Sequence, residues 1–177
     1  MTKAVIFDLD GTLIHLPIDY DKLFQQFGKI MKTSNIRPLT KTVAALDVET
    51  QKKVFDVWEE TEIGVLNKVT VNNEGLAIYQ KHSKTPKALV TMQGKTFVGK
   101  LLKTLHLSFV HVFTREDSLD RAEQLRVALK ELEVSPSEVL FIGNTDEDSR
   151  AAKGIGCKFQ RVADKTKLNT QPGRTQS

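Results

Sequence analysis

Five short apolar runs, each of four to six residues, constrain the fold more than any other feature of this sequence. They are residues 4–7, 88–91, 109–114, 139–143 and 157–162. Most of the runs are continuous rather than alternating, which is typical of strands buried on both faces of a parallel sheet. Between the later runs, apolar residues recur at helix spacing. This order of elements predicts an α/β fold with an open, doubly wound, Rossmann-like parallel sheet.

A helical block interrupts the pattern directly after the first run. Three stretches have helical patterns, namely residues 19–32, 40–46 and 49–66. No clear strand is expected between residues 15 and 72, and the alternation of strands and helices resumes near Asn73. We therefore expect an α/β core domain of residues 1–14 and 73–163, with a small helical cap of residues 15–72 inserted after the first strand. Residues 164–177 are polar and aperiodic, which predicts a disordered tail.

The composition of the 177 residues is that of a soluble globular protein, with 40% hydrophobic and 27% charged residues. The net charge of +4 suits an anionic ligand, but no basic stripe with interleaved aromatic residues indicates nucleic-acid binding. The single cysteine, Cys157, allows no intramolecular disulfide and indicates a reducing compartment. No apolar stretch approaches the ~18 residues of a membrane span, and the apolar start is too short for a signal peptide. We expect a cytoplasmic monomer or homodimer that binds neither nucleic acid nor membranes.

Polar residues follow four of the apolar runs at the point where each run ends. In strand order they are Asp8 and Asp10, then Thr91, then Arg115, then Asn144 and Asp148. Ligands of open α/β sheets bind beyond the carboxyl ends of the strands, so these groups are expected to converge there. The two aspartates alone could cap a turn, but the agreement of the other strand ends predicts an active site.

The segment FDLDGTL at residues 7–13 resembles the first motif of the haloacid dehalogenase-like hydrolase superfamily, whose members are mostly Mg²⁺-dependent phosphatases. Val90 and Thr91 resemble the second motif, a Ser or Thr that ends the next core strand. The segment IGNTDED at residues 142–148 resembles the fourth motif. One cap type of this family is inserted where the helical block lies. The resemblance covers residues 1 to about 163 and implies a phosphatase of the phosphoglycolate phosphatase-like group.

The residue types also suit the chemistry directly. A phosphate monoester hydrolyses very slowly, so a covalent intermediate is an advantage. Asp8 would attack phosphorus and form an aspartyl phosphate. Asp10, two residues on, points to the same side of an extended chain and would act as the general acid and base. Thr91 would donate a hydrogen bond to a phosphoryl oxygen.

Several carboxylates around a dianionic phosphate would repel it, so a Mg²⁺ cofactor is expected. Its predicted ligands are Asp8, the backbone carbonyl of Asp10, Asn144 and Asp148. The family usually has an acid at the position of Asn144. An amide oxygen supplies no charge, so the affinity for Mg²⁺ should fall unless Asp148 or Asp146 compensates. Asp146 is otherwise expected to be a helix N-cap.

Six further residues are expected to contact the substrate. They are Leu9, Gly11, Thr12, His15, Met92 and Arg115. Gly11 lets the backbone pass close to a phosphate, and the amide groups of Leu9 and Asp10 are candidate donors to a phosphoryl oxygen. His15 lies where the chain enters the cap and could face a small phosphorylated metabolite.

The third motif of the family is normally a Lys, but no Lys occurs between Lys103 and Lys130. Arg121 and Arg115 are the candidate replacements. Arg121 is favoured because it lies in the first turns of the helix that leads to the fourth motif, where the family places its Lys. Arginine suits phosphate binding because its guanidinium is planar and bidentate. The alternative for either arginine is a surface salt bridge with a neighbouring acid.

The leading hypothesis is a Mg²⁺-dependent phosphatase that hydrolyses a small soluble phosphomonoester. A phosphomutase or phosphotransferase of the same fold remains open, because a sugar hydroxyl can replace water as the acceptor. A decayed site is a third interpretation, in which Asn144 and the missing Lys mark a metal- or phosphate-binding or interaction protein. A halogen-removing enzyme is disfavoured, because that chemistry does not need the acid at Asp10.

Overall fold

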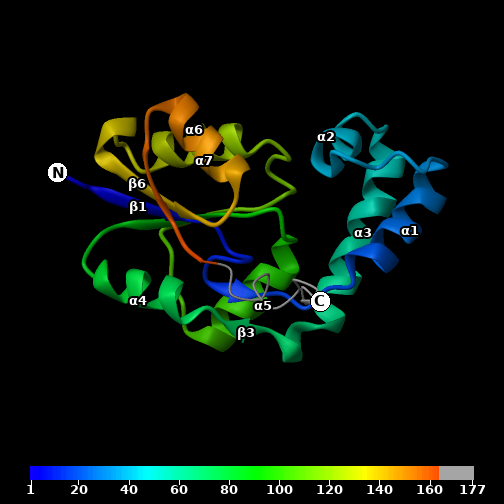
Figure 1. Cartoon of the computed structure of the whole chain (residues 1–177), viewed down its shortest axis with the longest axis horizontal. Helices are drawn as coiled ribbons and strands as arrows, with labels where there is room; N and C mark the ends of the chain where they lie inside the picture. The colour runs from blue at the N-terminus through cyan, green and yellow to red at the C-terminus, as the bar shows by residue number, and fades with distance from the viewer. Residues whose placement is uncertain (164–177) are drawn as a thin grey trace, which may run out of the picture.

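A five-stranded parallel sheet forms the centre of the protein, in a computed structural model that describes residues 1–163 (Figure 1). Its strand order is β5-β4-β1-β6-β7. The strands are β1 (Ala4–Phe7), β4 (Lys87–Val90), β5 (His111–Phe113), β6 (Val139–Gly143) and β7 (Lys158–Arg161). This confirms the predicted doubly wound α/β fold. The expected disordered tail, residues 164–177, lies outside the described residues.

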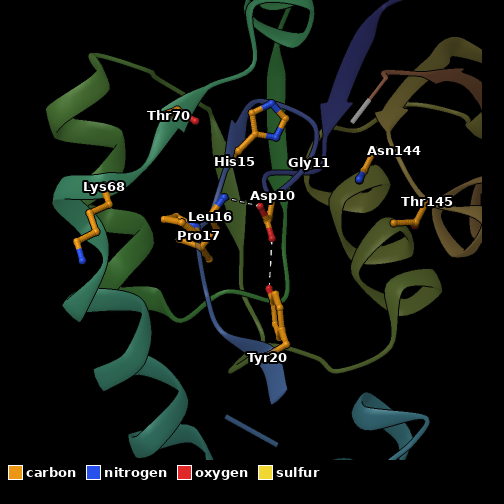
Figure 2. A pocket seen from close by; sticks show the side chains of 10 residues that line it. All are labelled: Asp10, Gly11, His15, Leu16, Pro17, Tyr20, Lys68, Thr70, Asn144 and Thr145. Carbon is orange, nitrogen blue, oxygen red and sulfur yellow. Dashed lines mark hydrogen bonds between the residues drawn. The ribbon is translucent and has the colours of Figure 1, made fainter. Parts of the chain in front are cut away.

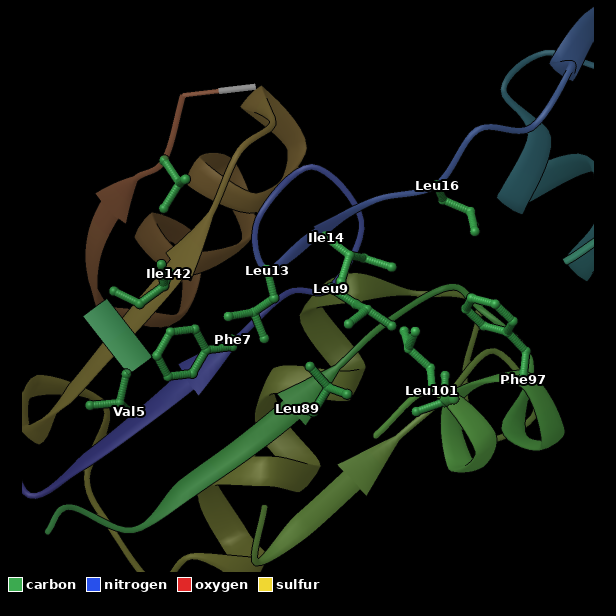
Figure 3. Close-up of a cluster of buried hydrophobic side chains, with 12 residues drawn as sticks. Val5, Phe7, Leu9, Leu13, Ile14, Leu16, Leu89, Phe97, Leu101 and Ile142 are labelled. Carbon is green, nitrogen blue, oxygen red and sulfur yellow. The ribbon is translucent and has the colours of Figure 1, made fainter. Parts of the chain in front are cut away.

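Two pairs of helices cover the two faces of the sheet (Figure 1). They are α4 (Asn73–Lys81) and α5 (Lys95–Leu105) on one face, and α6 (Arg121–Glu131) and α7 (Asp146–Ile155) on the other. Strand β1 contributes apolar side chains to both faces of the sheet. Val5 and Phe7 pack toward α4 and α5 (Figure 3). Ala4 and Ile6 pack toward α6 and α7. Burial on both faces explains why the run is continuous rather than alternating.

Three helices form the cap, and they lie together to one side of the sheet (Figure 1). They are α1 (Tyr20–Met31), α2 (Leu39–Ala44) and α3 (Val48–Gly64), and a short 3₁₀ turn, η1 (Leu66–Lys68), follows them. The cap has an apolar core of its own, in which Phe27 packs against Trp58 with 5.6 Å between ring centroids and the rings tilted at 58°. The three helices match the predicted helical stretches.

A small antiparallel ribbon joins the cap to the core domain. It pairs β2 (Ile14–His15) with β3 (Thr70–Val71). The expectation of no strand between residues 15 and 72 is therefore wrong. Each strand has only two residues, which is too short for any periodicity in the sequence. Strand β2 crosses the first expected domain boundary, and β3 ends just before the second. The boundaries stay a prediction.

The N-cap of helix α7 lies one residue before the residue that the sequence predicted. Thr145 is the N-cap, because its hydroxyl accepts a hydrogen bond of 3.0 Å from the backbone N–H of Asp148. The expected N-cap, Asp146, is instead the first helical residue. Gly156 ends the helix in the left-handed conformation, with φ of 93°. None of the helices within residues 1–163 combines the length and the hydrophobicity that a membrane span needs.

Candidate active site

The candidate active site lies beyond the carboxyl end of β1, the central strand. Its neighbours β4 and β6 lie on opposite sides of it, so the loops after all three strands meet at this edge. Asp8 directly follows β1, Thr91 follows β4, and Asn144 follows β6. The topology therefore brings these three predicted residues to one place.

Asp8 is buried, with 4% of its surface exposed. Its Oδ1 accepts a hydrogen bond of 2.7 Å from Nη2 of Arg121, and its Oδ2 accepts one of 3.2 Å from the hydroxyl of Thr12. Burial raises the pKa of Asp8 from 3.8 to about 7, and the guanidinium of Arg121 opposes that rise. The carboxylate of Asp148 raises the pKa further, and the backbone N–H of Leu9 lowers it. A nucleophilic role would require further positive charge nearby.

Arg121 is the cation that the structure places beside Asp8. It is the first residue of α6 and is 8% exposed. Its Nη2 contacts Asp8, its Nε lies 3.0 Å from Oδ1 of Asp148, and its Nη1 donates to Oε1 of Gln124 at 3.0 Å. Each of the three nitrogens thus has a different partner, and the guanidinium bridges the loop after β1 and the first turn of α7.

Arg115 does not reach Asp8. Its guanidinium is buried at the junction with the cap, where Nη1 lies 2.7 Å from Oε1 of Glu62 and the group stacks 4.6 Å above the ring of Trp58. Burial raises the pKa of Glu62 from 4.5 to about 7, against the opposing charge of Arg115. Arg115 is therefore not beside the nucleophile. Its Nε lies 3.8 Å from Oε1 of Glu116, a neighbouring acid, but the guanidinium is buried rather than at the surface.

Asp10 has its carboxylate held by the start of the cap (Figure 2). Oδ1 accepts a hydrogen bond of 2.9 Å from the backbone N–H of Leu16, and Oδ2 accepts one of 3.3 Å from the hydroxyl of Tyr20. Burial, and then the negative charge of Asp10, raise the pKa of Tyr20. The candidate acid and base is thus tied to the first residue of α1.

The turn after Asp10 requires glycine for two reasons. Gly11 has φ of +80°, which L side chains rarely adopt. A Cβ at this position would also lie 2.0 Å from Nδ2 of Asn144. The group that lies closest to Gly11 on this side is therefore the side-chain amide of Asn144. Asn72 holds the same turn, because its Nδ2 donates to the carbonyl of Gly11 at 3.2 Å.

Thr91 is fully buried at the end of β4. Its hydroxyl donates a short hydrogen bond to Oε1 of Gln93 and accepts one of 3.2 Å from the backbone N–H of the same residue. Binding of a phosphoryl oxygen by Thr91 would therefore require the hydroxyl to turn its hydrogen away from Gln93. Met92, between them, lines a cavity of about 190 Å³ that Asp8, Asp10 and Arg121 also line.

The acids after β6 already have partners. Oδ2 of Asp148 accepts hydrogen bonds from the hydroxyl of Thr145 at 2.6 Å and from its backbone N–H at 3.1 Å. Asp146 points to Arg161, at 2.6 Å. Oδ1 of Asp148 is buried without a hydrogen bond from the described residues. That either acid supplies the charge that Asn144 lacks stays a prediction.

A hard cation nevertheless has oxygen donors at this edge. The hydroxyl of Thr12 lies 3.2 Å from Oδ2 of Asp8 and 3.3 Å from Oδ1 of Asn144, and it has one hydrogen for the two acceptors. The oxygens of Asp8 and Asn144 thus face a common point. Among residues 1–163 no group of three or more His, Cys, Asp or Glu side chains is placed to hold a metal. The donor set suits Mg²⁺, which uses one or two carboxylates and keeps several waters.

A cavity of about 530 Å³ adjoins Asp10 on the side of the cap (Figure 2). Its lining residues are Asp10, Gly11, His15, Leu16, Pro17, Tyr20, Lys68, Thr70, Asn144 and Thr145. His15 comes from β2, at the edge of the small ribbon. The expected substrate contact at His15 therefore lies at a real cavity next to the candidate acid and base.

Four buried or half-buried residues of the site gave no signal in the sequence, namely Tyr20, Glu62, Asn72 and Gln124. The partners of Tyr20, Glu62 and Asn72 lie 10, 53 and 61 residues away along the chain. No short motif contains such a pair. A buried amide in an otherwise amphipathic helix, as at Gln124, is the one feature that helix periodicity could have indicated.

The family model described as "Haloacid dehalogenase-like hydrolase" matches residues 5–162. The chain belongs to the haloacid dehalogenase-like hydrolase family. The family predicted from the sequence is confirmed, and so is the predicted enzyme class, a haloacid dehalogenase-like phosphatase.

Individual known proteins resemble this chain over most of its length. A phosphoglycolate phosphatase from Shigella sonnei is 25% identical, over 88% of this chain and 79% of the relative. A haloacid dehalogenase-like family hydrolase from Streptococcus pneumoniae superimposes with a TM-score of 0.65 at 18% identity, covering 89% of this chain and 83% of that one. CbbY from Rhodobacter sphaeroides, solved in complex with phosphate, superimposes with a TM-score of 0.64 at 15% identity, covering 90% and 85%. The two structural likenesses show the fold.

Proposed function

We propose that this haloacid dehalogenase-like hydrolase is a Mg²⁺-dependent phosphatase that acts on a small phosphomonoester through an aspartyl phosphate on Asp8. The observation that carries the proposal is the buried Asp8 at the end of β1, paired at 2.7 Å with Arg121. The phosphoglycolate phosphatase among the relatives supports a small phosphorylated metabolite as substrate. A cytoplasmic location and a monomeric or dimeric state stay predictions.

The residues of the chain divide the reaction between them. Asp8 attacks phosphorus, and Arg121, whose Nη2 lies 2.7 Å from Asp8, offsets the negative charge that builds up. Asp10 protonates the leaving oxygen and later deprotonates the attacking water. The leaving group then occupies the cavity of about 530 Å³, which Asp10 lines.

The metal would be held by Asp8, the backbone carbonyl of Asp10 and Asn144. When bound, Mg²⁺ supplies positive charge that lets the phosphate approach the carboxylates. Asp148 would stay paired with Arg121, at 3.0 Å, and Thr145 holds its second oxygen. With one carboxylate in the donor set, binding of Mg²⁺ should be weak.

Hydrolysis of p-nitrophenyl phosphate with Mg²⁺ tests the proposal. The wild type should release p-nitrophenol, and Asp8→Asn should lose the activity by at least ~10³-fold, because an amide cannot act as the nucleophile. Asp56→Asn is the matched control, since that acid is exposed on α3 and pairs with Lys52 at 2.9 Å. Activity that survives Asp8→Asn would show that Asp8 is not the nucleophile.

Phosphoryl transfer to a second hydroxyl uses the same residues and stays a prediction. Reaction of a sugar phosphate, followed by analysis of the products, separates the two functions. Release of free phosphate without any new sugar phosphate indicates a phosphatase, whereas formation of an isomeric sugar phosphate indicates a mutase.

A further inference from the structure

Gln124 is a buried amide that connects three segments of the site. It lies three residues after Arg121 on α6, and 1% of its surface is exposed. Its Nε2 lies within hydrogen-bond distance of the backbone carbonyls of Thr91 at 2.8 Å, Ser118 at 2.9 Å and Thr114 at 3.1 Å, which share its two hydrogens. These carbonyls belong to the loops after β4 and β5, which border the candidate active site.

The three carbonyls fix which end of the amide faces Arg121. A carbonyl only accepts hydrogen bonds, so the NH₂ group of Gln124 must face them and its oxygen must point the other way. That oxygen accepts the hydrogen bond of 3.0 Å from Nη1 of Arg121. Because its NH₂ group is anchored in this way, the side-chain amide of Gln124 can accept a hydrogen bond from the guanidinium in one orientation only.

We propose that Gln124 is a positioning residue, which holds the guanidinium plane of Arg121 so that Nη2 meets Asp8 and Nε meets Asp148. The inference rests on the proposed function, in which Arg121 offsets the charge at Asp8. Gln124 itself touches none of the reacting groups.

Arg121 needs such a partner because its guanidinium could also turn toward other acids. Its long side chain has many rotamers, and a fixed set of acceptors is needed to confine it to one of them. A second cavity, of about 450 Å³, borders Arg121 on the side of α2, and the acids Asp120 and Glu147 line it. Without the contact at Nη1, the guanidinium could swing toward these acids and leave Asp8 buried without its cation.

The experiment compares Gln124→Met with Gln51→Met. Methionine has nearly the same volume but cannot make the hydrogen bonds. Gln51 is the matched control, because its Nε2 also donates to a backbone carbonyl, that of Val43 at 3.0 Å, but within the cap. Thermal unfolding shows whether each variant folds, and Gln124→Asn, which keeps the amide but is one methylene shorter, replaces Gln124→Met if that variant does not.

Two measurements separate positioning from a purely structural role. The first is the ¹⁵N spectrum of the arginine Nη groups, with the signal of Arg121 assigned by its loss in Arg121→Lys. The wild type and Gln51→Met should show slow rotation of this group, and the Gln124 variant should show averaged signals. Slow rotation that persists in the folded Gln124 variant would overturn the proposal. This readout needs no activity, so it stands even if the proposed phosphatase function fails.

The second measurement is a double-mutant cycle on the kcat for p-nitrophenyl phosphate. Gln124→Met should lower kcat by roughly 10- to 100-fold in the wild-type background, in line with the loss of one positioned charge contact. In the Arg121→Lys background the same change should lower kcat by less than about threefold, because the guanidinium is already gone. Equal losses in both backgrounds would show that Gln124 does not act through Arg121.

Discussion

Asn144 puts an amide where a carboxylate would give the metal site a second negative charge. Its Oδ1 lies 3.3 Å from the Thr12 hydroxyl, which contacts Asp8 at 3.2 Å. Affinity for hard cations rises with the number of charged ligands. Asn144→Asp should therefore lower the Mg²⁺ concentration for half-maximal activity by about tenfold, measured with p-nitrophenyl phosphate at fixed ionic strength.

Asn35→Asp, at an exposed position of the cap, adds the same charge away from the site and should leave the Mg²⁺ requirement unchanged. If Asn144→Asp and Asn35→Asp give the same Mg²⁺ dependence, Asn144 is not a ligand of the metal.

Gly75 lets α4 pack directly against the turn of the active site. A Cβ there would lie 1.8 Å from the backbone carbonyl oxygen of Thr12, which cannot move without shifting the turn that follows Asp8. Gly75→Ala should therefore lower the free energy of unfolding by roughly 1–3 kcal/mol, the usual range for overpacking. Urea unfolding measures this change.

Gly99→Ala, in a helix on the same face of the sheet, should change the free energy of unfolding in the opposite direction. A Cβ at Gly99 in α5 would meet nothing within 4 Å. Alanine should then stabilise the protein by about 0.5–1 kcal/mol through its higher helix propensity. If Gly75→Ala and Gly99→Ala change the free energy of unfolding alike, α4 does not pack tightly against the turn.

At the scale of the elements, the cap is joined to the core through the N-terminus of α5. Gly94, the N-cap of α5, has no capping side chain, and carboxylates of α3 take that role. Glu62 accepts from the N–H of Gly94 at 3.0 Å, and Glu59 accepts from the N–H of Thr96 at 2.9 Å. Negative charge at a helix N-terminus is favourable, so the joint stabilises both elements. Arg115 completes it through its contact with Glu62.

This joint should make stability depend on pH. The pKa of Glu62 is about 7 in the folded protein, against 4.5 as its usual value. Between these values the folded protein keeps a proton that the unfolded chain releases, so the free energy of unfolding falls as pH rises. One such group contributes at most about 1.4 kcal/mol per pH unit. Urea unfolding of Glu62→Gln at pH 5, 6, 7 and 8 should show a smaller fall than the wild type.

Glu60→Gln is the control for this comparison, because Glu60 is exposed on the same helix. It should follow the pH dependence of the wild type. A Glu62→Gln curve parallel to that of the wild type would mean that Glu62 does not take up a proton in this range.

The sequence predicted the long elements and missed the short or distant features, for identifiable reasons. Apolar runs such as 4–7 and 139–143 are strands because both of their faces are buried. The two-residue strands of the ribbon carry no pattern. The partner of Arg115 was equally hidden, since Glu62 lies 53 residues upstream, on a helix whose orientation toward the core follows from packing alone. The motif around Asp8 was readable because its residues are contiguous.

At the scale of the whole molecule, two apolar cores lie on the faces of the sheet and a third lies in the cap. The candidate site occupies the boundary between them. Asp8 and Arg121 belong to the core domain, whereas Tyr20 of the cap holds Asp10. The placement of the cap over this edge depends on contacts between distant segments, so the sequence could predict its existence but not its joint. A ligand bound at the boundary should therefore stabilise the entire fold.

Beryllium fluoride, a mimic of the phosphoryl group on an aspartate, tests this expectation. With Mg²⁺ and beryllium fluoride at about 100 times the dissociation constant, stabilisation should be about 2.7 kcal/mol. For a chain of this length that corresponds to a rise in Tm of roughly 5–10 °C. Asp8→Asn should show no rise, because the mimic needs the carboxylate, and Mg²⁺ with fluoride alone is the control for the salt. A wild type whose Tm does not respond would favour the decayed site that Asn144 suggests, since a site able to form an aspartyl phosphate must also hold its mimic.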